Sequence, residues 1–287
     1  MRSMYRVCVI VTLLCLLSSC VRHRGGGTNQ QLLKIDSMSM CDSDTLFSSP
    51  TEKKLFPNVD GIFDDFFSLF LVDESLRDER IDFPLQYQNR ISGHDTVFMS
   101  EEWKNHALLP MEVEIYTSIY EKETDMMLEG DTTLRSVFVE YILMEQNKVF
   151  TLHFSKNTDE WRLVRVVENE LGKYVHGDFI SFYHQFVTDS VYQSLHVQDP
   201  LVFITSDPED DFNVLEATIG REQWFAFRPA LPIGKLVNIN YTARASSVVS
   251  RSRILQLKNI STGSITNLYF RLRSGEWKLV RLEDTSN

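Results

Sequence analysis

This chain has few cysteines, no apolar run long enough to span a bilayer and no excess of basic residues. Its 287 residues include 4 Cys, 12 Gly and 8 Pro, with 29 Lys or Arg against 40 Asp or Glu. This composition excludes disulfide-dense, collagen-like and largely disordered proteins. The formal net charge of −11 argues against a nucleic-acid binder, which carries a basic face or stripe. We therefore expect a globular protein without a nucleic-acid partner.

Motifs of metal sites and of hydrolase nucleophiles are also absent from the sequence. The seven histidines form no His-Glu-x-x-His set, and neither Cys-x-x-Cys nor Gly-x-Ser-x-Gly occurs. His176 beside Asp178 favours a helix-start cap over a pair of metal ligands. The acidic residues 207–211 favour a solvated turn over a calcium loop, because the alternating oxygen ligands and the glycine are missing. The sequence thus predicts no catalytic residue, metal or cofactor.

The first twenty residues have the layout of a secretion signal. Arg2 and Arg6 precede an apolar run at 7–17, which is too short for a bilayer span of about 20 residues. The Leu-Ser-Ser-Cys ending at Cys20 resembles the bacterial lipobox, whose cysteine receives a diacylglyceryl group and becomes the first mature residue. The resemblance implies a signal peptide at 1–19 and lipid attachment at Cys20. An uncleaved anchor and a plain secretory signal are the alternatives.

Residues 20–56 are polar, contain three consecutive glycines and lack apolar periodicity, so we expect a flexible tether. The expected location is the bacterial cell envelope, with the membrane contacted through the amino-terminal lipid. Basic residues follow Cys20 in place of the acidic ones associated with surface export of Bacteroidota-type lipoproteins, which favours a periplasm-facing position. Cys41 is the one remaining mature cysteine, so it is either a free thiol or paired with another chain.

The rest of the chain contains an internal repeat with an offset of 116 residues. Two windows align at this offset, and the tryptophans Trp103 and Trp224 correspond if the second copy carries about five extra residues. We therefore expect two homologous domains, at 57–172 and 173–287. The aligned positions in the first copy are Val59, Gly61, Phe63, Phe66, Phe70, Asp73, Pro84, Leu85, Leu152, Phe154, Glu160, Trp161, Leu163, Val164 and Arg165.

Each copy begins with a helical pattern and ends with a strand pattern. Aromatic residues recur at i, i+3, i+4 and i+7 from Phe63 and again from Phe179, which predicts helices whose aromatic stripe packs on a sheet. Pro84 and Pro200 mark the change to extended chain. Alternation of apolar and polar residues predicts a final hairpin in each copy, and further strands. The expected strands are 137–144, 149–155, 161–167, 236–243, 266–272 and 277–283.

A leading aromatic helix followed by a meander that ends in a polar turn and Glu-Trp-Arg/Lys-Leu-Val resembles the nuclear transport factor 2-like fold. The motif occurs at 160–164 and 276–280. The resemblance implies an α+β class with two tandem cone-like domains, each with helices packed on a curved antiparallel sheet. The layout is also similar to a family of uncharacterised Bacteroidales envelope lipoproteins. Neither resemblance carries a catalytic motif over to this sequence.

Four residues are candidates for the lining of a cavity. Arg165 and Arg281 are expected to share a strand face with the neighbouring tryptophan and leucine of each copy, which points a guanidinium into the cone. Such a group needs a carboxylate or a bound anion. His153 and Tyr269 are equivalent at the offset of 116 and are expected beside them. The alternative is an arginine that pairs with a surface acid at a strand end.

The two copies differ in charge. Residues 60–172 contain 10 basic and 24 acidic residues, whereas 173–287 contain 12 of each. The basic residues Arg244, Arg251, Arg253 and Lys258 cluster in the second copy. Charge differences between domains usually serve solubility. A more specific hypothesis is that these basic residues contact acids of the first copy. A further one is that the acidic copy faces a cationic partner.

From these patterns we expect a non-catalytic envelope lipoprotein that binds a partner protein or a small ligand. An isomerase- or hydrolase-like enzyme with an active site in one cone is the alternative. An inward-facing acid beside a tyrosine would favour the enzyme, and Tyr116, Tyr120, Tyr141 and Tyr241 are available. Cones whose interior is filled by side chains would favour a protein that interacts with a partner. The oligomeric state is not encoded in any of these patterns.

Overall fold

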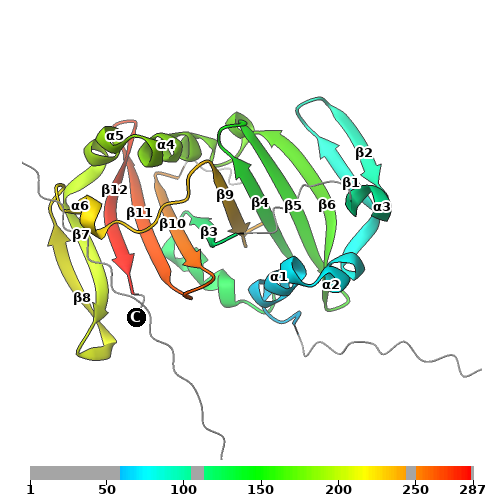
Figure 1. The fold of residues 1–287 in the computed structure, drawn as a ribbon, viewed down its shortest axis with the longest axis horizontal. Coiled ribbons are helices and arrows are strands. Elements are labelled where there is room, and N and C mark those ends of the chain that lie inside the picture. Colours follow the sequence, from blue (N-terminus) through cyan, green and yellow to red (C-terminus); the bar gives the residue numbers. More distant parts are fainter. Residues whose placement is uncertain (1–58, 105–112, 244–249, 286–287) are drawn as a thin grey trace, which may run out of the picture. The chain divides into compact units, whose positions relative to one another are not determined.

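A single sheet of twelve strands runs through the fold (Figure 1). The computed structural model describes residues 59–104, 113–243 and 250–285, and residues 54–287 form one compact unit. The expected signal peptide, the tether, Cys20 and Cys41 lie outside the described residues. None of the helices in the described ranges is long and apolar enough to cross a membrane.

The two halves of the chain contain the same succession of α-helices and strands, and the 3-10 helix η1 of the first half has no counterpart among the described residues of the second. The first half comprises α1 (Phe63–Val72), α2 (Glu74–Glu79), β1 (Ile81–Asn89), β2 (His94–Phe98), α3 (Ser100–Lys104), β3 (Ile115–Tyr120), the 3-10 helix η1 (Glu123–Gly130), β4 (Ser136–Leu143), β5 (Lys148–Asn157) and β6 (Glu160–Glu170). The second comprises α4 (Gly177–Thr188), α5 (Ser190–Leu195), β7 (Val197–Asp207), β8 (Asp210–Ile219), α6 (Trp224–Phe227), β9 (Lys235–Asn240), β10 (Ser252–Asn259), β11 (Ile265–Arg273) and β12 (Glu276–Asp284). The 3-10 helix η2 (Leu171–Lys173) connects them.

The halves exchange one strand at the centre of the sheet. The strand order is β2-β1-β6-β5-β4-β9-β3-β10-β11-β12-β7-β8, so β9 of the second half pairs with β4, and β3 of the first half pairs with β10. Strands β1 to β6 of the first half correspond in order to β7 to β12 of the second. When each strand is replaced by its equivalent, the order read from one edge of the sheet equals the order read from the other edge. Because β3 and β9 are parallel neighbours, the approximate two-fold axis runs along the strands, and the halves use opposite faces of the sheet.

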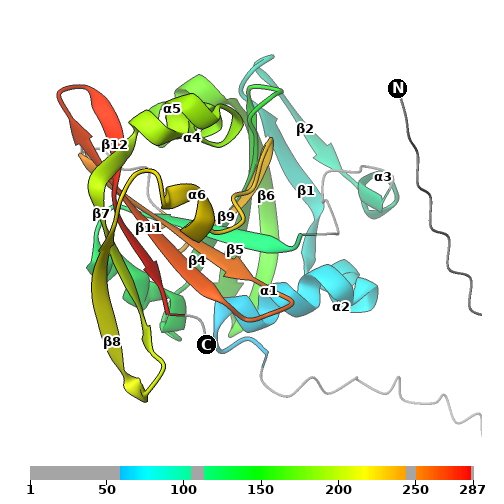
Figure 2. The same ribbon diagram turned by 60° about the vertical axis from the view of Figure 1, so that its left-hand side comes forward.

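Each face of the sheet is covered by one leading helix. Phe63, Phe66, Phe67 and Phe70 of α1 are at most 1% exposed and pack with β4, β5, β6 and β9 in one core. Helix α4 packs in the other core with β10, β11 and β12. We call these the α1 face and the α4 face; Figure 2 shows the two leading helices at separate places on the sheet.

The aromatic contacts confirm that the helical stripes are core. The ring of Phe63 meets Phe154 at 5.4 Å and Trp161 at 5.0 Å between centroids. In the second half, Phe179 meets Phe270 at 5.2 Å and Trp277 at 5.4 Å. Edge-on packing of this kind is the favoured geometry of aromatic pairs.

Local sequence fixes the helix starts and the hairpin turns. The Asp73 carboxylate caps α2 by accepting from the Leu76 amide at 3.0 Å, and Asp189 caps α5 in the same way. The final hairpins turn at Thr158–Asp159 and at Ser274–Gly275, and all four residues have a positive φ. Turns with positive φ at both positions match the twist of the flanking strands.

Several sequence expectations differ from the structure. Two separate domains at 57–172 and 173–287 are not confirmed, because the halves share one sheet and exchange a strand. Pro84 and Pro200 lie inside β1 and β7 instead of at the helix ends. The two edge hairpins, β1–β2 and β7–β8, were not expected. The acidic residues 207–211 belong to the second of these hairpins, where β7 ends and β8 begins.

Candidate functional site

The four expected cavity residues form two pairs. In the first half, Arg165 Nη2 donates to His153 Nδ1 at 2.8 Å, and the imidazole stacks on Phe138 with 4.1 Å between centroids. Burial, together with the charges of Arg165 and Arg90, lowers the pKa of His153 to about 4. The imidazole is therefore neutral near pH 7 and accepts from the guanidinium.

In the second half, the Arg281 guanidinium lies over the Tyr269 ring, 3.5 Å from its centroid. Arg281 Nη2 donates to Glu123 Oε1 at 2.6 Å, and the Tyr269 hydroxyl donates to Glu283 at 2.6 Å. Burial and the Glu283 hydrogen bond raise the pKa of Tyr269 to about 12. This guanidinium is stacked and paired with an acid of the first half.

Neither arginine shares a face with its neighbouring tryptophan, contrary to the sequence expectation. A β-bulge shifts the register between His153 and Phe154, so Arg165 pairs with His153 on the face opposite to Trp161. The same irregularity recurs in β11–β12, where Arg281 pairs with Tyr269. One extra residue in a strand reverses the alternation of faces beyond it. Both pairs consequently face away from the leading helix of their own half.

A first polar cluster, not expected from the sequence, lies on the α4 face where β4 meets β9. We call Glu140, Tyr174, Asn238 and Asn240 the sealed cluster. Both carboxylate oxygens of Glu140 accept hydrogen bonds: Oε2 from Asn238 at 2.7 Å and from the Tyr174 hydroxyl, and Oε1 from Asn240 at 3.3 Å. Burial raises the pKa of Glu140, and these donors oppose the rise. The cluster joins strands of both halves.

His176 and Arg253 lie beside the sealed cluster. Burial and the charge of Arg253 lower the pKa of His176 to about 3. His176 precedes α4 but forms no side-chain cap, so the expected helix cap is wrong; its ring packs edge-on against Tyr174, 5.4 Å away. Arg253 is 4% exposed and lies 3.7 Å from Glu121 of the first half.

A second polar cluster lies on the α1 face, over β4, β9, β3 and β10. We give the name open cluster to Asp64, Tyr241 and Lys258, which hydrogen bonds join, together with Tyr141 of β4 and Gln256 of β10, which lie on the same face of the sheet. Asp64 Oδ1 accepts from the Tyr241 hydroxyl at 2.6 Å, and Oδ2 accepts from Lys258 Nζ at 2.9 Å. Lys258 Nζ also lies 2.5 Å from Glu129 of η1. Burial and the charge of Asp64 raise the pKa of Tyr241 well above its usual value.

Two buried polar atoms of the open cluster are unsatisfied. The Tyr141 hydroxyl and Gln256 Oε1 have no hydrogen-bond partner among the described residues, although the two side chains are 1% and 4% exposed. Tyr116 joins the same face, and burial beside Asp64 raises its pKa to about 12. A buried polar group without a partner calls for an explanation, and a bound water or a ligand is one.

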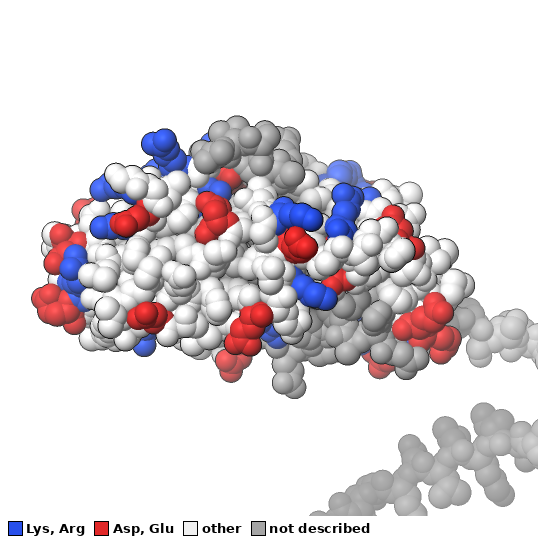
Figure 3. Space-filling view, turned by 90° about the horizontal axis from the view of Figure 1, so that it is seen from above, with Lys and Arg blue, Asp and Glu red and all other residues white. Residues whose placement is uncertain are grey.

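Basic residues of the second half meet acids of the first half, as one sequence hypothesis predicted. Three of these contacts join Lys258 to Asp64 and Glu129, and Arg253 to Glu121. Arg244 of the same basic cluster lies outside the described residues. On the face in Figure 3, acidic and basic side chains are interspersed.

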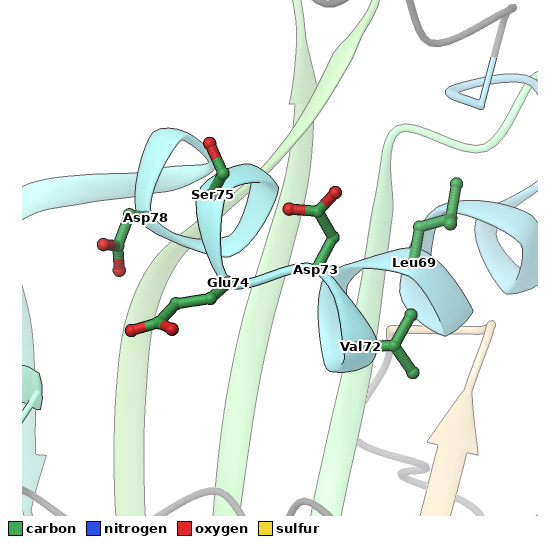
Figure 4. A pocket seen from close by; sticks show the side chains of 6 residues that line it. All are labelled: Leu69, Val72, Asp73, Glu74, Ser75 and Asp78. Atoms are coloured by element: carbon green, nitrogen blue, oxygen red, sulfur yellow. The ribbon is translucent and has the colours of Figure 1, made fainter.

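A shallow surface pocket lies where α1 passes into α2 (Figure 4). It is lined by Leu69, Val72, Asp73, Glu74, Ser75 and Asp78. Asp73 caps α2 and Asp78 pairs with Lys104 at 2.7 Å, so two of its three acids have structural partners. In the described ranges, no three His, Cys, Asp or Glu side chains are grouped closely enough to hold a metal ion.

Comparison with known proteins identifies the fold class first. The chain is similar to a crystal structure of an NTF2-like protein from Bacteroides fragilis, with 39% sequence identity and a TM-score of 0.73 over 80% of this chain and 98% of that one. This chain thus has an α+β NTF2-like fold with a large sheet and few helices. A family model described as a domain of unknown function, DUF4348, matches residues 42–284, and the chain belongs to this family. No curated protein matches it.

Proposed function

We propose that this chain is a lipid-anchored module of the bacterial cell envelope that binds a small polar ligand without transforming it. The open cluster is the observation that carries the proposal, because Tyr141 and Gln256 hold buried polar atoms without a partner among the described residues. Each such atom costs about 1–3 kcal/mol, and a ligand hydroxyl or amide removes that cost. The ligand is not an anion, since Lys258 is already paired with two carboxylates, Asp64 and Glu129; we expect a neutral molecule.

The hydrogen bonds that Asp64 and Glu140 already accept support binding over catalysis. A general base must be free to reach the proton that it removes. Asp64 already accepts from Tyr241 and Lys258, and Glu140 accepts from three donors.

An isomerase- or hydrolase-like activity is the second candidate, because an acid lies beside a phenol in both clusters. The phenol of Tyr174 donates to Glu140, and that of Tyr241 donates to Asp64. Catalysis would require a substrate to displace one of these bonds. Turnover of a carbonyl or ester substrate that Asp64→Asn abolishes while ligand affinity persists would establish the enzyme.

The lipid anchor is supported by the lipobox-like ending at Cys20 and by a relative of bacterial origin. Expression of Cys20→Ser in a bacterial host tests it. We expect the wild-type chain in the membrane fraction with added lipid mass, and the variant without that mass in the soluble fraction. A variant that stays in the membrane fraction contradicts lipid anchoring at this cysteine.

Ligand binding is tested on the full chain, purified in detergent from native membranes and analysed by mass spectrometry after denaturation. We expect a small neutral molecule in amounts near one per chain. The double variant Tyr141→Phe/Gln256→Leu should reduce its recovery at least tenfold. Tyr183→Phe is the matched control, because that hydroxyl already donates to the Pro232 carbonyl on the α4 face. Equal recovery from both variants contradicts the proposal.

A further inference from the structure

We propose that the free edge of β8 receives an extended, positively charged segment of a partner protein as an additional strand. This inference rests on the β7–β8 hairpin and is independent of ligand binding in the open cluster. Strand addition at a sheet edge obtains affinity from main-chain hydrogen bonds and specificity from alternate side chains.

Among the described residues, no strand lies beside the outer edge of β8. β8 ends the sheet (Figure 1) and pairs with β7 alone, and residues 213–218 are all exposed. Proteins usually protect such an edge with charged side chains, proline, a β-bulge or a short strand. The ten residues of β8 include neither lysine nor proline, and every charged residue among them is acidic, so the edge repels acidic strands and not basic ones; β2 at the opposite edge has five residues.

Apolar side chains border this edge. Val214 and Leu215 are 59% and 44% exposed. Leu215 pairs with Thr205, and the neighbouring Phe203 ring lies 5.6 Å from Phe227 of α6, which is itself 47% exposed. One face of the hairpin therefore offers an apolar border for every second side chain of an added strand.

The negative charge of the β7–β8 hairpin favours a positively charged partner. Residues 197–219 contain six Asp or Glu and no Lys or Arg, whereas the β1–β2 hairpin at 81–98 contains two acids and one arginine. Pairing of β8 with a second copy would bring two such acidic hairpins together, and their repulsion disfavours a homodimer through this edge. A partner strand that alternates apolar and basic residues can pack on the exposed apolar side chains of the hairpin and pair its basic residues with the acids.

The test measures binding of a fluorescent ten-residue peptide of alternating Val and Lys to the full chain in detergent. We expect saturable binding that weakens with salt. The same peptide with its four central amides N-methylated keeps its charge but cannot pair as a strand, so its affinity should fall at least tenfold. A peptide of alternating Val and Glu should not bind.

Two exposed glutamates provide the matched protein variants. Glu216→Lys changes the edge strand and should weaken peptide binding at least tenfold, whereas Glu79→Lys at the end of α2 alters net charge equally and should leave it within twofold. Equal effects of the two variants, or undiminished binding of the N-methylated peptide, would overturn the proposal in favour of unspecific attraction. Self-association of the wild-type chain that Glu216→Lys strengthens would overturn it in favour of a second copy.

Discussion

The sealed and open clusters occupy related positions in the two halves and differ in how the side chains at the equivalent positions of β4 and β10 are satisfied, although Asn238 Oδ1 of the sealed cluster also lacks a partner among the described residues. Glu140 of β4 and Gln256 of β10 are 116 residues apart, and each is paired with the exchanged strand of the other half, at Asn238 and Ser118. Glu140 has both oxygens hydrogen-bonded, whereas Gln256 Oε1 lacks a partner among the described residues. One position therefore stabilises the fold, and the other remains available to a ligand.

This difference follows from the side chains that each half supplies to the exchanged strand. β9 supplies two asparagines to the α4 face, and their amides donate to the carboxylate. β3 supplies Ser118 and Tyr120 to the α1 face, where Lys258 and Asp64 balance each other instead. Two halves with one topology can thus divide stability and binding between them. Separate substitutions in each cluster test this division.

The largest effect is expected when the halves are separated, because both clusters need strands from both halves. Residues 54–172 expressed alone lack β9, and residues 173–287 lack β3, so each loses the central strand of its own core. We expect neither half to give a cooperative unfolding transition by circular dichroism. Co-expression of the halves should restore one. Cooperative unfolding of either half alone would contradict an obligatory exchange.

Local patterns explain why part of this fold was predictable. The aromatic stripe from Phe63 and the final hairpins depend on nearby residues, and the structure confirms them. The exchange of β3 and β9 was not predicted, because a strand pattern does not specify its partner. The bulge near Arg165 was not predicted, because apolar and polar residues still alternate before and after the extra residue. Only the face to which each type points is reversed beyond it. A signal for the sealed cluster was present: Glu140 is the single acid in the otherwise apolar strand pattern 137–144.

Replacement of the sheet residue in each cluster should change the stability by very different amounts. Glu140→Leu leaves three buried donors without an acceptor, and we expect the free energy of unfolding to fall by about 3–5 kcal/mol. Gln256→Leu removes an oxygen that is already unsatisfied, so stability should change by less than about 1 kcal/mol. Chemical denaturation of the two variants measures both values. Comparable losses would show that the two clusters do not differ.

Removal of a single hydroxyl sharpens the comparison. Tyr174→Phe deletes a donor to Glu140, and we expect a loss of about 1.5–3 kcal/mol. Tyr141→Phe deletes a hydroxyl without a partner among the described residues, so the unfolding free energy should stay constant or rise while ligand binding falls. A destabilised Tyr141→Phe protein, purified free of ligand, would mean that an internal water already satisfies this hydroxyl.

The smallest expected effect is a pH dependence of stability near the sealed cluster. Burial beside Arg253 holds the pKa of His176 at about 3, against 6.5 in the unfolded chain. The unfolded state therefore binds the extra proton between these values, and stability is complete above pH 6.5 and declines as the pH falls toward 3. From pH 7 to pH 6 the histidine contributes a loss of about 0.7 kcal/mol.

His176→Leu should remove this contribution, so we compare the change in unfolding free energy from pH 7 to pH 6 in the variant and the wild type. His153, whose pKa is lowered to about 4, remains in the variant and keeps part of the decline. Glu140 acts in the opposite sense, because its raised pKa stabilises the fold as the pH falls toward 4.5. The double variant Glu140→Gln/His176→Leu separates the two. An unchanged pH slope in His176→Leu would place this imidazole in contact with water, and the cluster beside it would then not be sealed.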